Sequence, residues 1–114
     1  MSRTLQHQLP AIKLCAEEKN TQKRRKMINA CCDHNFTKAI TECCWNVTNG
    51  RTPMSEHKVQ QLKRHKTLLR KLSSSSVPLK QRTELIQSGS GFATLLPLLL
   101  GPVISGITQL IKRK

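Results

Sequence analysis

Apolar residues recur along this chain at intervals of three and four, which is the spacing of one face of an α-helix. The clearest stripe joins Phe36, Ala39 and Ile40, Cys43 and Cys44, and Val47. Thr21, Asn35 and Ser55 stand just before such stripes, where N-cap residues are expected. The pattern predicts helices over Leu9–Cys15, Gln22–Cys32, Phe36–Val47, Glu56–Leu72 and Pro78–Gln87.

Composition supports a small helical bundle. The 114 residues include two Phe, one Trp and no Tyr, so the core must be aliphatic. Sandwiches and barrels would require more aromatic and β-branched residues. We therefore predict an all-α protein of about four to five short helices plus a hinged C-terminal apolar helix. The predicted organisation is a basic arm (1–9), a basic helical domain (10–87), a Ser/Gly joint (88–91) and an apolar segment with a cationic end (92–114).

The C-terminal segment contains twenty residues without a charge, from Phe92 to Ile111. A helix of that length, about 30 Å, is long enough to span a bilayer. Because Pro97, Gly101 and Pro102 interrupt it, we expect interfacial insertion, docking in a groove or self-association rather than a permanent span. The side chains expected to contact a membrane or a partner are Phe92, Leu95, Leu96, Leu99, Val103, Ile107 and Leu110.

Charge points to a polyanionic partner. The chain has 20 Lys and Arg against six Asp and Glu, a net charge of +14. Eight of the cations lie between Glu56 and Glu84 without an intervening acid, and such clustering is typical of phosphate-binding surfaces. Because the aromatic platforms of single-strand and RNA readers are missing, duplex DNA bound through its backbone is the expected partner. The main candidate contacts are Lys58, Lys63, Arg64, Lys66, Arg70 and Lys71.

A second basic run, Lys23, Arg24, Arg25 and Lys26, precedes the apolar stripe of the helix predicted over 22–32. The run could contact phosphate or act as a nuclear localisation signal. It could equally be the solvated outer face of that helix.

The five cysteines do not have the spacing of a metal site. Cys31 and Cys32 are adjacent, as are Cys43 and Cys44, so the members of each pair diverge by about 100° around a helix. Buried apolar packing explains them better than zinc or a redox pair. No catalytic constellation is visible, so we expect a non-enzymatic protein without a cofactor. Met1 to Cys15 contains no signal-peptide h-region, which predicts a reduced chain that is not secreted.

Five segments of the chain share one order with known sequences: LPAIKL (9–14), NVTNGRTPMS (46–55), LKRHKTLLRKL (62–72), VPLKQRTELIQ (77–87) and GFATLLPLLLGPVIS (91–105). Together they resemble a family of short basic proteins encoded by Maverick/Polinton DNA elements and the related adintoviruses. The resemblance runs from about residue 4 to the end, and the basic helix, the V-x-L-K run and the opening of the apolar segment are its most specific parts.

The resemblance implies a minor virion or core component that packs DNA and connects it to capsid protein or membrane through residues 92–111. The layout is also similar to that of the condensing core protein X of adenoviruses. The expected location is the virion and the host nucleus or cytoplasm. Two other functions fit the sequence: a membrane-active or tail-anchored protein that binds anionic lipid, and a protein-interaction adaptor.

Overall fold

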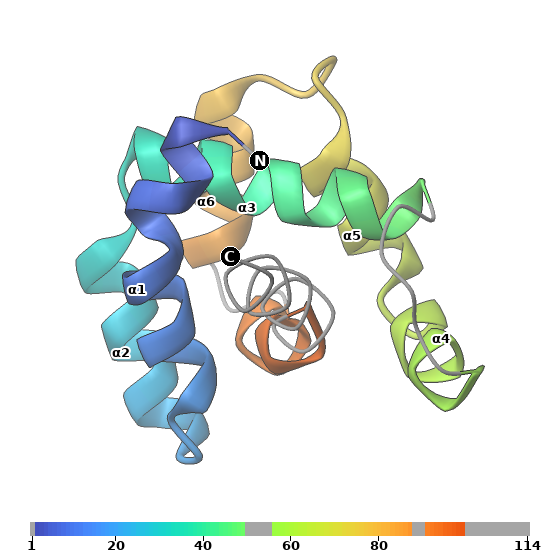
Figure 1. Cartoon of the computed structure of the whole chain (residues 1–114), viewed down its shortest axis with the longest axis horizontal. Helices are drawn as coiled ribbons and strands as arrows, with labels where there is room; N and C mark the ends of the chain where they lie inside the picture. The colour runs from blue at the N-terminus through green and yellow to red at the C-terminus, as the bar shows by residue number, and fades with distance from the viewer. Residues whose placement is uncertain (1, 50–55, 88–90, 100–114) are drawn as a thin grey trace, which may run out of the picture.

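The computed structural model describes residues 2–49, 56–87 and 91–99, and every regular element in those ranges is an α-helix (Figure 1). In chain order the helices are α1 (Arg3–Glu17), α2 (Thr21–Cys31), α3 (His34–Thr48), α4 (Glu56–Lys63), α5 (Lys66–Ser73) and α6 (Leu79–Gln87). Residues 92–99 are also helical. The predicted all-α class is confirmed for these residues. The predicted hinge at 88–90 and the rest of the apolar segment, from residue 100, lie outside them.

Helix α3 is the centre of the bundle. It packs against α1, α5 and α6, and in Figure 1 it crosses the molecule with α1 and α2 at one end and α5 at the other. Its buried face contains Phe36, Ile40 and Cys44, each fully buried, as the apolar stripe predicts. Burying one side chain of this size contributes roughly 1.5–3 kcal/mol, so α3 is the main source of core stability among the described helices.

Helix α1 begins six residues earlier than the predicted start at Leu9, so most of the predicted basic arm is helical. The Ser2 side chain caps the helix by accepting a hydrogen bond of 3.1 Å from the Leu5 amide. Ser2 also hydrogen-bonds the Glu42 carboxylate on α3 through its amide and its hydroxyl. Leu5 is buried in the core. A single apolar residue among polar neighbours gives little periodic signal, which is why the sequence pattern missed this turn.

Two other caps differ from the predicted ones by one or two residues. Asn20, not Thr21, caps α2 by accepting from the Lys23 amide at 3.0 Å. Asp33, not Asn35, caps α3 by accepting from the Phe36 amide at 2.8 Å. Both are residue types that favour the N-cap position, and the helices themselves agree with the prediction.

Helix α6 is joined to α3 by polar contacts as well as by apolar packing. The hydroxyls of Thr37 and Thr83 lie 2.7 Å apart. One turn along α3, Thr41 accepts a 2.7 Å hydrogen bond from the Arg82 guanidinium. Thr37 is fully buried. Because a buried hydroxyl requires a partner, these contacts fix which face of α6 meets α3.

The helix formed by residues 92–99 is part of the core. Phe92, Leu95 and Leu96 are fully buried, and Leu99 is 2% exposed. Gly91 starts the helix with a φ of +99°, a conformation that favours glycine, and its carbonyl accepts from the Leu95 amide at 3.0 Å. Figure 1 shows this helix in the middle of the molecule, nearly end-on.

Candidate nucleic-acid interface

The basic segment 56–72 forms two helices rather than the predicted single one. The chain turns at Arg64 and His65, where the amide of His65 bonds the carbonyl of Leu62 at 2.9 Å. Helix α5 then begins at Lys66, and its Leu69 amide bonds the His65 carbonyl. The turn reorients the second half of the segment, so the cations of residues 56–72 do not form one continuous stripe. They fall instead into two groups.

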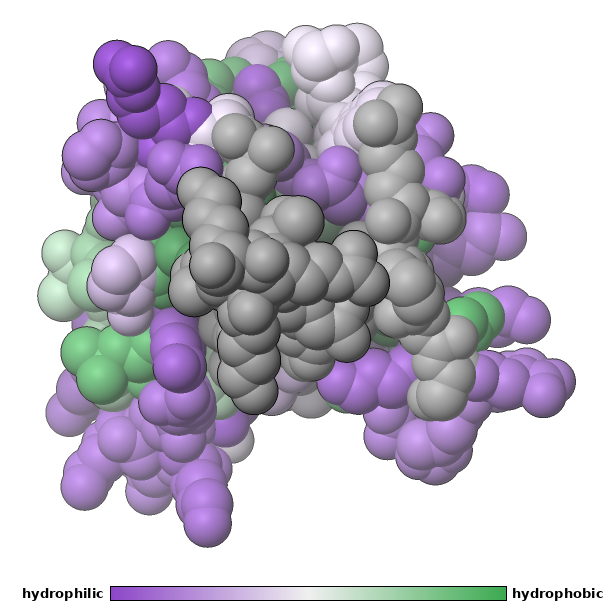
Figure 2. Space-filling view, in the orientation of Figure 1, coloured by the Kyte–Doolittle hydropathy of each residue, from purple (hydrophilic) through white to green (hydrophobic). Residues whose placement is uncertain are grey.

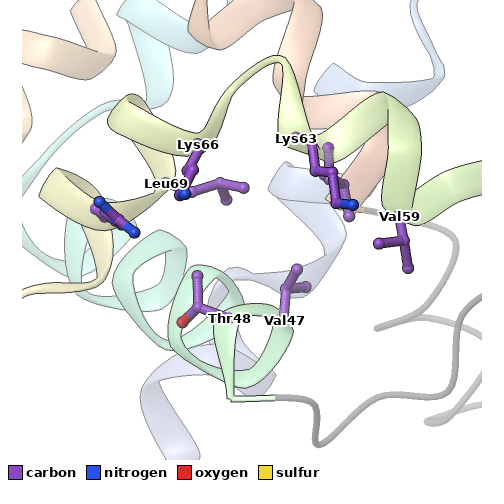
Figure 3. Close-up of a pocket in the computed structure, with 8 residues that line it drawn as sticks. Val47, Thr48, Val59, Lys63, Lys66 and Leu69 are labelled. Carbon is purple, nitrogen blue, oxygen red and sulfur yellow. The ribbon is translucent and has the colours of Figure 1, made fainter.

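The first group borders a groove. Lys63 on α4 and Lys66 and Arg70 on α5 are exposed and line a groove of about 670 Å³ together with Val59, Leu62 and Leu69. Val47 and Thr48, at the end of α3, form the opposite wall. Figure 3 shows these side chains converging from the three helices.

The second group lies towards α6. Arg64 and Lys71, both exposed, line a hollow with Thr67, Leu68 and Leu85. Lys71 also borders a neighbouring hollow that contains Glu84. Lys71 therefore has a carboxylate in its surroundings, whereas none of the described residues that line the groove of the first group is an acid.

The sixth predicted contact, Lys58, differs from the other five. It lies in the first half of α4 and is half-buried, and it makes an interaction with another group. The structure thus presents five exposed cations at the junction of α4 and α5: Lys63, Arg64, Lys66, Arg70 and Lys71. We call this set the α4–α5 basic surface.

The α4–α5 basic surface is not neutralised internally. Within the described ranges, an ion pair joins Lys13 and Glu17 on α1, at 4.0 Å, and none involves these five cations. Figure 2 shows hydrophilic side chains gathered over α4 and, at the other end of the molecule, over α1 and α2. Unpaired, exposed Lys and Arg side chains are free to contact phosphates and release counterions.

The residues of the second basic run have two different environments in the structure. Lys23, Arg25 and Lys26 are exposed on α2, but Arg24 is only 9% exposed. Its Nε donates a 2.9 Å hydrogen bond to the Glu18 carbonyl, and its Nη1 donates one of 2.7 Å to the Ala93 carbonyl. The role of Arg24 as a DNA contact stays a prediction; in this structure its guanidinium is nearly buried and hydrogen-bonded to these two backbone carbonyls. The sequence does contain a signal for this: Arg24 precedes Ile28 by four residues and so shares its face.

The apolar residues expected to contact a membrane or a partner fall into two groups, four that the structure describes and three outside the described residues. Phe92, Leu95, Leu96 and Leu99 pack into this chain's own core, so in this structure they are not available for an external contact. Their contact with a membrane or a partner stays a prediction. Burying such a helix adds apolar area to a small core with few aromatic residues. Val103, Ile107 and Leu110 lie outside the described residues.

The cysteines pack as small apolar side chains. Cys15, Cys43 and Cys44 are buried and Cys31 and Cys32 half-buried. Burial, reinforced by the neighbouring Cys31, raises the pKa of the Cys15 thiol from its ordinary 9.0 to about 11. Burial likewise raises the pKa of Cys43 to about 12 and that of Cys44 well above the ordinary value. Thiols held in this protonated form are weak nucleophiles.

Two features are absent from the residues that the structure describes. No group of three or more His, Cys, Asp or Glu side chains is placed to hold a metal ion there. None of the described helices combines the length and the hydropathy that crossing a bilayer requires.

Comparison with known proteins adds no identification. No protein-family model matches the chain, and no curated protein or solved structure shows significant similarity to it.

Proposed function

We propose that this protein binds duplex DNA without sequence preference, through the α4–α5 basic surface. The observation that carries the proposal is the set of five exposed cations on two adjoining helices, none of them ion-paired within the described part of the chain. A net charge of +14 adds long-range attraction to any polyanion. Exposed cations that form no ion pair have none to lose when they contact phosphate.

The biological setting that we propose is a virion or core component of a virus-like DNA element, which acts by binding rather than by catalysis. This setting rests on the resemblance to proteins of Maverick/Polinton elements and adintoviruses. Packing of encapsidated DNA requires sequence-independent contacts, which Lys and Arg supply. The residues proposed to dock on capsid protein or membrane are those predicted from Phe92 to Leu110, of which Phe92, Leu95, Leu96 and Leu99 are buried in this structure.

The test is the salt dependence of binding to a duplex of arbitrary sequence. For B-DNA, the slope of log K against log salt concentration is about −0.9 for each phosphate contacted. Changing Lys63, Arg64, Lys66, Arg70 and Lys71 to Gln should therefore make the slope shallower by about four. Gln is compatible with a helix, so the fold should be retained.

The matched control removes five exposed cations elsewhere and so produces the same net charge. Suitable positions are Arg3, Lys13, Lys19, Lys38 and Lys80, all exposed. The control variant should keep most of the wild-type slope. If the two variants lose slope equally, binding depends on net charge alone, and the assignment to the α4–α5 basic surface is wrong.

A further inference from the structure

The groove beside the α4–α5 basic surface has a feature that DNA binding does not use. Its floor is apolar: Leu62, Leu69 and Val47 are 4%, 5% and 7% exposed, and Val59 is half-buried at its side. A phosphate backbone would contact the bordering cations and leave this floor unused. The ligand that matches the whole groove therefore has both apolar and anionic parts.

The charge at the groove is of one sign. Among the described residues, Lys63, Lys66 and Arg70 line it, and no Asp or Glu does. Thr48, the remaining polar residue of the lining, donates its hydroxyl proton to the carbonyl of Trp45 at 3.1 Å. The groove thus offers cationic donors around an apolar centre, which complements a segment with one or two apolar side chains between carboxylates.

The apolar surface of the groove favours a peptide over a lipid-like molecule as its ligand. An acyl chain binds well where most of its surface becomes buried. The floor side chains here expose only a few per cent of their surface, so the apolar area that they offer matches one or two side chains better than a long alkyl chain. Helix-in-groove recognition uses anchors of this size at spacings of three, four and seven residues.

We infer that the groove between α3, α4 and α5 binds an acidic segment of a partner protein, with one or two apolar anchors on Val59, Leu62 and Leu69 and its carboxylates on Lys63, Lys66 and Arg70. This inference goes beyond DNA binding and does not depend on it. Because the three cations belong also to the α4–α5 basic surface, the acidic segment and DNA compete for them.

The probe is a fluorescein-labelled amphipathic peptide with Leu at positions i, i+3 and i+7 and Glu at the flanking positions. Binding to the full chain is measured by fluorescence anisotropy. Two control peptides separate the contributions: one carries Gln in place of each Leu and so retains the charge, and the other carries Lys in place of each Glu. We expect the first to bind about tenfold more weakly and the second not to bind.

The protein variants locate the site. Val59→Gln leaves the net charge unchanged and should weaken peptide binding about tenfold, a loss typical of an anchor contact. Val77→Gln is the matched control, because Val77 is equally half-buried but lines the hollow near α6, and it should leave peptide affinity unchanged. DNA affinity should be the same in both variants, so failure of this inference is distinguishable from failure of the DNA role.

Several outcomes would overturn the inference. Equal binding of the Leu and Gln peptides would show that charge alone attracts the probe. Equal affinity of Val59→Gln and wild type would place the peptide elsewhere. Displacement of the peptide by dodecyl phosphate, with that amphiphile bound more tightly, would make the site a lipid site. If Val59→Gln does not fold by circular dichroism, the exposed pair Lys63→Gln and Arg70→Gln replaces it, and unchanged peptide affinity in that variant overturns the inference equally.

Discussion

Arg24 on α2 donates a 2.7 Å hydrogen bond from Nη1 to the backbone oxygen of Ala93, which lies 69 residues further along the chain. Nε and Nη2 of the same guanidinium bond the carbonyl of Glu18, the C-cap residue of α1. The negative end of the α1 dipole favours a cation at that position. One side chain thus ties the end of α1 and the helix 92–99 to α2.

Replacing Arg24 with Ala should destabilise the fold. The buried carbonyl of Ala93 and the part-buried carbonyl of Glu18 would lose this donor, and an unsatisfied buried group costs about 1–3 kcal/mol. Urea denaturation should show a lower free energy of unfolding for Arg24→Ala, whereas Arg25→Ala, at an exposed position, should stay within about 0.5 kcal/mol of wild type. Equal midpoints for the two variants would contradict the structure.

Shortening a buried side chain of the helix 92–99 should lower the free energy of unfolding as much as shortening one elsewhere in the core. Leu96 is fully buried, and Leu14 is 63% exposed. Leu96→Ala should lower the free energy of unfolding by about 2–5 kcal/mol, and Leu14→Ala should change it little. Thermal and urea unfolding report the difference. A mild effect at Leu96 would mean that this helix does not pack on the bundle in solution.

The Thr37–Thr83 contact predicts an energetic coupling between α3 and α6. Each hydroxyl has one proton, and each also lies 3.0 Å from a carbonyl of its own element or cap, that of Asp33 or that of Leu79. One hydroxyl must therefore donate its only proton to the other hydroxyl, and it then makes no hydrogen bond to its carbonyl. Thr37→Val or Thr83→Val alone should be destabilising, and the double variant should cost less than the sum of the two.

A double-mutant cycle measures this coupling, which should lie at about 0.5–1.5 kcal/mol. The exposed Thr94 serves as a control for the Thr→Val change itself. Additive effects of Thr37→Val and Thr83→Val would show that the two hydroxyls do not interact.

The sequence pattern located the helices well where apolar residues recur on one face, as on α3. It did not show the turn at Arg64 and His65, because Leu62 and Leu69 are seven residues apart and remain on one side of an uninterrupted helix. The only local indication was Lys66, a cation on the otherwise apolar line of that helix. A broken and an unbroken helix bury the same leucines, so periodicity alone does not separate them.

The exposure of the cations on 56–72 was predicted more accurately than their arrangement. Five of the six cations predicted on 56–72 are exposed, but their division into two groups follows from the turn and was not predictable. The burial of Phe92 and Leu96 shows the same limit of prediction from the sequence. Their apolar character indicates that they must be covered, yet helical spacing does not specify whether the covering surface belongs to this chain or to another molecule.

Alkaline pH should destabilise the protein through its buried thiols. Well below pH 9 the Cys15 thiol is protonated in both the folded and the unfolded chain, so it adds no pH dependence there. Between its ordinary pKa of 9.0 and the folded value of about 11, the unfolded chain loses this proton while the folded chain retains it. The free energy of unfolding must therefore fall as pH rises through this window, and Cys43, with a pKa of about 12, extends the fall. Urea titrations from pH 8 to 11 in reducing buffer should give a steeper decline for wild type than for Cys15→Ala. Lysine ionisation is common to both proteins and cancels in the comparison, so parallel declines would show that Cys15 is not desolvated in the folded chain.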